Sequence, residues 1–186
     1  CEHGATVGDC YKCSSDPYIR AHGFFIPGEV RHPPGGCGKC SDQVGGQYGA
    51  DYFLRGKELG ISGYTNYRWM PELTIPMVEK IIIHLGISKD DTVLDFGCAR
   101  GYMVRALRKM GYFAYGLDTS RWAIQNADPS VIHYLTYNPE LALPTGPPTY
   151  GWVLAKDVLE HIPAVADTVE QLMGAAVRGV FVVVPL

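Results

Sequence analysis

The stretch LDFGCARGY, residues 94–102, decides the fold. Its first residues belong to an apolar run that is typical of a buried strand, and this run contains the acid Asp95. A loop with Gly97 and Gly101 follows, and it leads into residues whose apolar positions recur with helical spacing. A glycine loop between a strand and a helix offers free backbone N–H groups and lets a ligand approach the backbone closely. The stretch therefore predicts a nucleotide-binding loop in an α/β protein.

On both sides of this loop, strand patterns alternate with helix patterns. The expected strands are residues 92–96, 113–117, 131–135, 150–155 and 180–184, and the expected helices are residues 74–85, 101–110, 120–127 and 165–175. Residues 138–149 hold four prolines, which predicts a loop. The alternation indicates βαβ units, and hence a Rossmann-like parallel sheet with helices on both faces.

The last expected strand, residues 180–184, is almost wholly apolar, which suits a strand that is covered on both faces of a sheet. If no further strand pairs with it, it is an exposed apolar edge that attracts other chains. We therefore expect a chain that is truncated after its fifth strand, with C-terminal strands missing, or else self-association or a partner at this strand. The first residue is Cys1 rather than Met, so we expect a processed chain or a fragment.

The composition is that of a globular protein with one main domain and a small appendage. Of its 186 residues, 47% are hydrophobic and 19% are charged. No apolar run approaches the roughly 20 residues of a membrane helix, and we expect no signal segment. The net charge of -3 gives no general attraction to nucleic acid. We expect a cytoplasmic protein that binds neither membranes nor nucleic acid.

Residues 1–46 are rich in Cys, Gly and Pro, and we expect them to form a small zinc-ribbon-like appendage. They contain two C-x-x-C pairs, formed by Cys10 with Cys13 and by Cys37 with Cys40. Paired thiolates at this spacing suit a structural, tetrahedral Zn²⁺ site. Disulfides are the alternative, and a nearby histidine could replace one of the cysteines.

Residues 47–186 are expected to form the core domain, and residues 47–73 a lid at its start, because aromatic residues are dense there. Tyr64 and Tyr67 could cover a bound cation through cation–π contacts, and plain packing of an aromatic cluster is the alternative. Arg68 could pair with the carboxylate of a cofactor as a bidentate donor, and a surface arginine is the alternative.

Three motifs stand in order over about seventy residues: VLDFGCARGY from residue 93, YGLDTS from residue 115 and LAKDVLEHIP from residue 154. With this order and spacing, the chain resembles the class I S-adenosylmethionine-dependent methyltransferases. The resemblance implies a parallel sheet of seven strands, of which five are counted here. It also implies S-adenosylmethionine as the cofactor and methyl transfer as the activity.

The resemblance also assigns roles to residues of the motifs. It implies that the methionine part of the cofactor is held by Asp95, Gly97, Ala99 and Gly101, and that the ribose hydroxyls are held by Asp118. The neighbouring cofactor contacts that we expect are Cys98, Tyr102 and Thr119, with Arg68 from the lid. Ionised carboxylates accept hydroxyl donors well and favour a cofactor with sulfonium and ammonium charges. The alternatives are a solvated turn acid for Asp118, a turn or capping acid for Asp95, and a small packing residue for Cys98.

A nicotinamide-dependent dehydrogenase would need the pattern G-x-G-x-x-G in this loop. Here the second and third glycines are replaced by Ala99 and Tyr102, which disfavours that class.

Methyl transfer from a sulfonium is a direct displacement, so the protein mainly holds donor and acceptor in line and excludes water. His161 is the candidate base for an acceptor that must lose a proton, and a histidine satisfied by backbone groups at a helix start is the alternative. Some sugar C-methyltransferases are similar in placing a zinc segment before this core, which suggests a sugar or sugar nucleotide among small-molecule acceptors. The rival hypothesis is a non-catalytic module that binds a cofactor or a partner.

Overall fold

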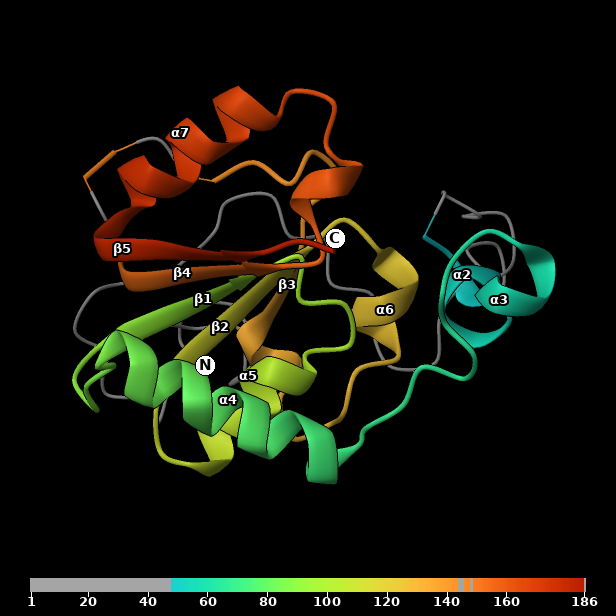
Figure 1. Cartoon of the computed structure of the whole chain (residues 1–186), viewed down its shortest axis with the longest axis horizontal. Helices are drawn as coiled ribbons and strands as arrows, with labels where there is room; N and C mark the ends of the chain where they lie inside the picture. The colour runs from blue at the N-terminus through green and yellow to red at the C-terminus, as the bar shows by residue number, and fades with distance from the viewer. Residues whose placement is uncertain (1–47, 144–145, 148, 186) are drawn as a thin grey trace, which may run out of the picture. The chain divides into compact units, whose positions relative to one another are not determined.

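The computed structural model describes residues 48–143, 146–147 and 149–185, all within the larger of two compact units, His32–Leu186. Five parallel strands form one sheet in the order β3-β2-β1-β4-β5 (Figure 1). The strands are β1 (Thr92–Phe96), β2 (Phe113–Asp118), β3 (Leu135–Tyr137), β4 (Tyr150–Lys156) and β5 (Ala176–Val183). The predicted Rossmann-like parallel sheet is therefore confirmed.

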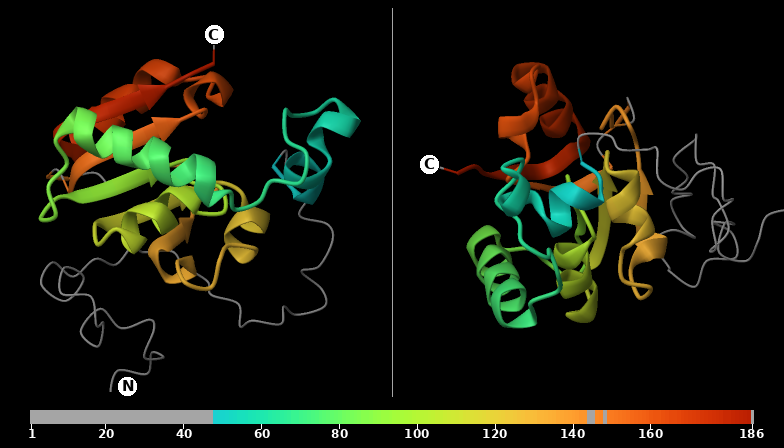
Figure 2. Two further views of the ribbon diagram at one scale, coloured as in Figure 1. Left: turned by 60° about the horizontal axis from the view of Figure 1, so that its bottom comes forward. Right: turned by 90° about the vertical axis from the view of Figure 1, so that its right-hand side faces the viewer.

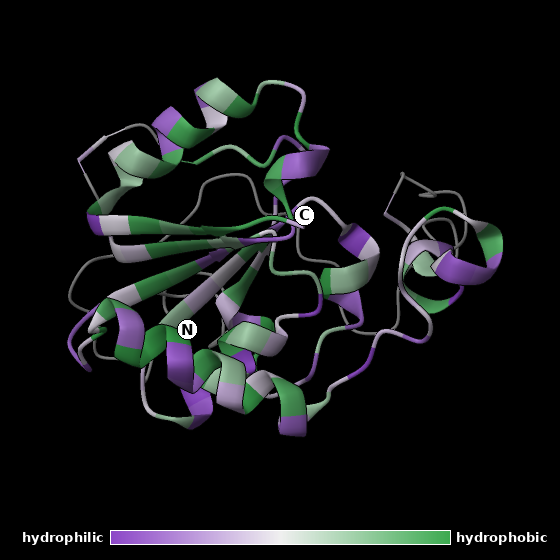
Figure 3. Cartoon of the chain, in the orientation of Figure 1, coloured by the Kyte–Doolittle hydropathy of each residue, from purple (hydrophilic) through white to green (hydrophobic). Residues whose placement is uncertain are grey.

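Helices cover both faces of this sheet. Helices α4 (Pro71–Leu85) and α5 (Tyr102–Lys109) lie on one face and α7 (Val165–Ala175) lies on the other (Figures 1 and 2). The short helix α6 (Arg121–Gln125) packs against β2 and β3. Both α4 and α7 alternate between hydrophobic and hydrophilic residues, as expected of helices with one buried side (Figure 3). Among the described residues, no helix is both long and apolar enough to span a bilayer.

The hydrophobic core lies between the sheet and the pair α4 and α5. Val78 and Ile81 of α4 meet Val104 and Leu107 of α5 there, and Val93 of β1 lies beneath them. All five are buried, three of them without measurable exposure. Because a strand buried on both faces cannot slip without exposing apolar side chains, this packing fixes β1 and the loop that follows it.

Helix α4 begins at Pro71, three residues before the predicted start. Proline suits the first helical position, because its fixed φ is helical and its missing N–H would have no partner there. The helix ends as predicted, since Gly86 adopts the left-handed conformation that closes a helix.

The third and fifth strands also differ from their predicted ranges. The third was expected over residues 131–135, but Ile132–Tyr134 forms a 3-10 helix and β3 begins at Leu135, where pairing with Gly116 of β2 starts. The fifth begins at Ala176, because its pairing with β4 starts there. It is the edge strand of the described sheet, and Val182 of the predicted range is 40% exposed, so the described residues do not cover it on both faces. Further strands or a partner at this edge stay a prediction.

The chain between residues 137 and 150 forms neither helix nor strand where it is described, as the prolines predicted. Ahead of α4, the aromatic segment forms two short helices, α2 (Ala50–Leu54) and α3 (Gly56–Leu59). We call residues 48–69 the lid.

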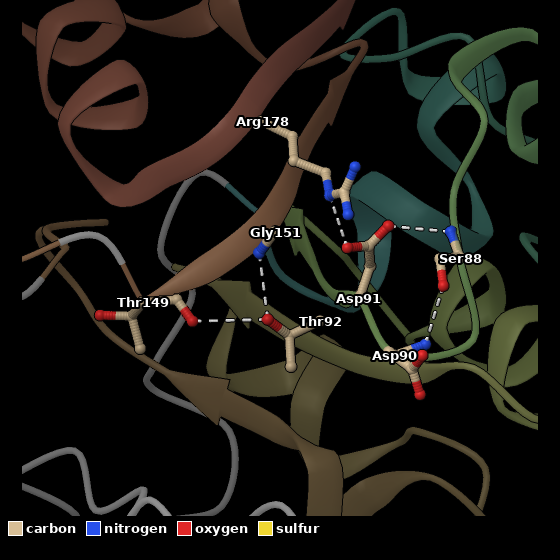
Figure 4. Close-up of polar contacts among 7 residues, drawn as sticks. All are labelled: Ser88, Asp90, Asp91, Thr92, Thr149, Gly151 and Arg178. Carbon is tan, nitrogen blue, oxygen red and sulfur yellow. Dashed lines mark hydrogen bonds and ion pairs between the residues drawn. The ribbon is translucent and has the colours of Figure 1, made fainter.

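The amino end of β1 is held by a network of polar contacts (Figure 4). The Asp91 carboxylate accepts a hydrogen bond from the Ser88 N–H at 2.8 Å and pairs with Arg178 Nε at 2.7 Å. The Thr92 hydroxyl donates to the Thr149 carbonyl at 3.4 Å and accepts from the Gly151 N–H at 3.0 Å. These contacts join β1 to the starts of β4 and β5.

Candidate functional site

The site is built on the glycine loop between β1 and α5. Gly97 and Gly101 have φ values of +77° and +72°, which side-chain-bearing residues rarely adopt. A Cβ on Gly97 would lie 2.2 Å from Val158 Cγ2, and a Cβ on Gly101 would lie 2.6 Å from Leu135 Cδ1. Both glycines are therefore required by conformation and by space, and the loop lies close against Val158, which follows β4, and Leu135, which begins β3.

Asp118 ends β2 and binds this loop directly. Its Oδ2 accepts a hydrogen bond from the Ala99 N–H and its Oδ1 accepts one from the Ser120 N–H, each at 2.6 Å. Burial raises the pKa of Asp118, and these two hydrogen bonds counteract the rise. A carboxylate has about four acceptor positions, so both oxygens can still accept hydroxyl donors from a ligand.

Asp95 is the next-to-last residue of β1 and only 5% exposed. No residue that the structure describes donates a hydrogen bond to its carboxylate. Burial first, and then the neighbouring Asp118, raise the pKa of Asp95 from an ordinary 3.8 to about 7, while Lys156 lowers it. A buried carboxylate without a partner is costly, so such a group is kept where a ligand supplies the missing cation.

A pocket of about 310 Å³ opens at the carboxyl ends of the strands, where open α/β sheets bind ligands. Its lining comes from the lid, from the loops after β1 and β2, from residues 139–142, and from the segment between β4 and α7. The lining residues used below are Tyr48, Tyr52, Tyr64, Gly97, Ala99, Asp118, Thr119, Glu140, Asp157 and His161.

The residues predicted from sequence fall into three groups. Gly97, Ala99, Asp118, Thr119 and His161 line the pocket. Asp95, Cys98, Gly101 and Tyr102 belong to β1, the glycine loop and the start of α5 without lining the pocket. Arg68 is exposed and does not line it, so its pairing with a cofactor stays a prediction that this geometry does not support.

The Cys98 side chain is buried and would collide with any side chain at Gly116, 2.6 Å from a Cβ there. Burial raises the pKa of its thiol well above the ordinary value, which keeps the thiol neutral. Cys98 thus packs the loop against β2, in agreement with the packing alternative.

The predicted zinc ligands Cys10, Cys13, Cys37 and Cys40 lie outside the described residues. Within the described part of the chain, no cluster of three or more His, Cys, Asp or Glu side chains could hold a metal ion. The zinc site stays a prediction.

Two tethers between the lid and the site were missed from sequence. The Ser120 hydroxyl donates to the Tyr48 carbonyl at 2.6 Å, so the residue that caps α6 also holds the start of the lid. Arg100, within the glycine loop, donates to the Tyr67 carbonyl at 3.0 Å and to the Asn126 carbonyl at 2.8 Å. The lid is thereby fastened to both motifs that are predicted to bind the cofactor.

Asp157 is a further residue with unusual geometry at the pocket. It follows β4 with a φ of +54°, in the left-handed region, and its carboxylate pairs with Lys156. Non-glycine residues in this region concentrate at functional sites.

No curated protein matches the sequence significantly. Solved structures do match the described fold, at low sequence identity. Coclaurine N-methyltransferase bound to N-methylheliamine and SAH is 15% identical with a TM-score of 0.51, over 59% of this chain and 35% of that one. A Methanococcus maripaludis protein assigned as an S-adenosyl-L-methionine-dependent methyltransferase is 19% identical with a TM-score of 0.51, over 58% of this chain and 52% of that one. These similarities concern the fold alone.

The chain spans only 44%, 61% and 50% of the first three solved structures that it matches. One of them, a SAM-dependent methyltransferase from Aquifex aeolicus, is 20% identical over 57% of this chain, with a TM-score of 0.48. At the level of sequence, the family model described as a methyltransferase domain matches residues 69–183. This range includes all five strands and the residues Asp95, Gly97 and Asp118. The chain belongs to this methyltransferase domain family.

Proposed function

We propose that the protein transfers a methyl group from S-adenosylmethionine to a small-molecule acceptor. The observation that carries the proposal is Asp95, a buried acid without a hydrogen-bond donor among the described residues, beside a glycine loop and a second buried acid. S-adenosylmethionine offers what these groups lack, namely a sulfonium, an ammonium group and two ribose hydroxyls. Family membership supports the same reaction class.

The residues present fit this cofactor in type. The N–H groups and left-handed glycines of residues 97–101 would hold its methionine part, with Asp95 as the nearby anion. The free acceptor positions of Asp118 would take the ribose hydroxyls. When bound, the cofactor supplies a methyl group that its sulfonium has activated. The protein's own task is then to hold the acceptor in line and to exclude water.

His161 is the pocket residue best suited to move a proton. Its side chain is 41% exposed, its Nε2 lies 3.9 Å from Glu160 Oε1, and its ring meets Tyr48 edge to face at 6.0 Å between centroids. An imidazole that lines the pocket while reaching solvent can take a proton from an acceptor and pass it to water. The base role of His161 belongs to the proposal.

The acceptor suggested from sequence, a sugar or sugar nucleotide, receives limited support. No lysine or arginine stands among the described residues that line the pocket, so nothing there would pair with a diphosphate. A sugar without phosphate groups stays compatible with the proposal. A structural zinc at the four N-terminal cysteines, a cytoplasmic location and association at β5 also stay predictions.

The test is calorimetric titration with S-adenosylmethionine, with NAD as the control ligand, followed by a turnover assay over an acceptor screen. We expect micromolar binding of S-adenosylmethionine alone. His161→Ala should slow turnover while cofactor affinity stays, and His161→Gln, which keeps the size but not the basicity, should be equally slow. Absence of S-adenosylmethionine binding would refute the proposal. Binding without turnover of any acceptor would favour the rival hypothesis of a non-catalytic module.

A further inference from the structure

In the part of the pocket that the predicted cofactor-binding residues do not form, aromatic and acidic groups stand among apolar residues. We call Tyr48, Tyr52, Tyr64, Asp157 and His161 the acceptor wall, since all five line the pocket and none belongs to the glycine loop or to β2. The rings of the wall contact one another edge to face. The centroids of Tyr48 and Tyr52 lie 5.0 Å apart and those of Tyr52 and Tyr64 lie 5.8 Å apart. Tyrosine faces attract cations through their negative quadrupole.

The charges around the acceptor wall are mostly negative. Asp118, Glu140 and Asp157 line the pocket, and Glu160 adjoins His161. Against these four acids stands Lys156, which is already paired with Asp157. The single net positive charge that S-adenosylmethionine brings is too small to neutralise the remainder, so an anionic acceptor would be repelled even beside the bound cofactor.

The negative charges around the wall also act on its tyrosine hydroxyl groups. Burial first, and then Tyr52, Asp157, Glu160 and Asp118 in that order, raise the pKa of Tyr64 to about 12. The pKa of Tyr48 is likewise raised by burial, then by Asp118 and Glu160. No basic group acts on the pKa of either tyrosine. The tyrosine rings of the wall therefore stay uncharged, and the groups around them are mostly acidic.

We infer that the methyl acceptor is an amine on a small molecule that carries neither phosphate nor carboxylate groups. The inference rests on the proposed function and names its substrate class. An ammonium group suits the wall through its tyrosine faces and Asp157. To react, the ammonium gives a proton to His161, which releases the nitrogen lone pair. That pair forms the new N–C bond, while the C–S bond breaks and its electrons remain on sulfur as a neutral thioether.

The experiment compares three probes of similar size on the full chain: 2-phenylethylamine, 2-phenylethanol and phenylacetate. S-adenosylhomocysteine is titrated first, and each probe is then titrated with and without it. We expect the amine to bind at least tenfold more tightly than phenylacetate and several-fold more tightly than the alcohol. Equal affinities, or tighter binding of phenylacetate, would overturn the inference while S-adenosylhomocysteine binding upholds the proposed function. Failure of S-adenosylhomocysteine to bind would count against the proposed function, and the probes without it still decide which charge the wall prefers.

A substitution tests whether Asp157 contributes. Asp157→Asn removes the charge but keeps the shape, and asparagine tolerates the left-handed backbone at this position. We expect a three- to tenfold loss of affinity for 2-phenylethylamine and an unchanged affinity for 2-phenylethanol. Asp167→Asn is the matched control, because Asp167 lies in the first turn of α7 and does not line the pocket. An equal loss for amine and alcohol would mean that Asp157 shapes the pocket rather than attracting the charge.

Discussion

Two buried aspartates, Asp91 and Asp95, lie toward opposite ends of β1: Asp91 directly precedes the strand and Asp95 is its next-to-last residue. They are 7% and 5% exposed, so burial does not distinguish them. Asp91 is paired with Arg178 and accepts a hydrogen bond from Ser88 (Figure 4), whereas no described residue donates a hydrogen bond to Asp95. The comparison teaches that hydrogen-bond partners, rather than depth of burial, distinguish an acid that holds the fold from the acid that we propose to bind the cofactor.

The difference extends to the two ends of the sheet. At the amino end, the Thr92 hydroxyl accepts a hydrogen bond from the Gly151 N–H and donates one to the Thr149 carbonyl, so it is satisfied both as an acceptor and as a donor. At the carboxyl end, Asp95 and Asp118 are two acids whose pKa values are both raised by burial. Because like charges in a buried site oppose folding, the two acids at the carboxyl end lower the stability of the fold, whereas the contacts at the amino end raise it.

The largest effect is expected from Asp95→Asn, which removes the buried charge and nearly keeps the shape. Removing one partner of a buried charge pair costs about 3–5 kcal/mol, so affinity for S-adenosylmethionine should fall on the order of a thousandfold. Without cofactor, the variant should be more stable than the natural chain above pH 8 by about 1–3 kcal/mol, since it lacks the buried carboxylate charge that has no partner. Calorimetry and urea unfolding measure the two effects. A variant that binds the cofactor normally would place Asp95 with Asp91 among the structural acids.

The pH dependence of stability sharpens the same contrast. Because the pKa of Asp95 is about 7 in the folded protein and 3.8 is its ordinary value, the folded state binds a proton between these limits that the unfolded state has lost. The free energy of unfolding that Asp95 contributes is therefore fully present below about pH 4 and is lost as pH rises through about 7, by up to about 4 kcal/mol. The measurement is urea unfolding at pH 5 and pH 8.

Asp95→Asn provides the control for this pH dependence, since the other titrating groups remain. The loss of stability between pH 5 and pH 8 should be clearly smaller in the variant than in the natural chain. In addition, S-adenosylmethionine should favour the ionised form and release protons near pH 7, so the binding enthalpy should vary with the ionisation enthalpy of the buffer. Identical pH profiles for both chains would contradict the raised pKa of Asp95.

Asp91→Asn should have the opposite effect of Asp95→Asn. Hydrogen bonds to charged groups contribute about 1.5–3 kcal/mol, and the variant weakens the contacts with Ser88 and Arg178, so stability should fall by about 1–3 kcal/mol. Affinity for S-adenosylmethionine should stay within twofold. Parallel unfolding and binding measurements on both variants check this reversal, and a loss of affinity in Asp91→Asn without a loss of stability would break the comparison.

Strand β1, which contains Asp95 and directly follows Asp91, could be predicted from sequence because its pattern is local. Residues 92–96 are β1 as expected, and Gly97 and Asp118 lie at the pocket because the strand-loop-helix pattern fixes where a strand ends. The start of β3 could not be predicted, since pairing with β2 sets it and overrides the apolar run before it. The tethers of the lid were also hidden, because they join side chains to carbonyls 33 and 72 residues away.

The smallest effect is expected at one of these tethers, through Arg100→Met. Methionine keeps much of the length of the side chain but loses both hydrogen bonds, to Tyr67 and to Asn126, at a partly exposed site where the loss should be about 1 kcal/mol. The lid should then open about fivefold more often, and trypsin should cut after Lys57 correspondingly faster. Arg121→Met is the matched control, because Arg121 lies over Tyr137 and forms no hydrogen bond, ion pair or ring contact with the described residues of the lid. Unchanged cleavage in Arg100→Met would mean that aromatic packing alone holds the lid, as between Phe53 and Trp122, whose rings stack at 5.4 Å. Faster cleavage with unchanged affinity for S-adenosylmethionine would instead mean that the lid does not contribute to cofactor binding, unlike Asp95, and would favour a role of the lid in binding the acceptor.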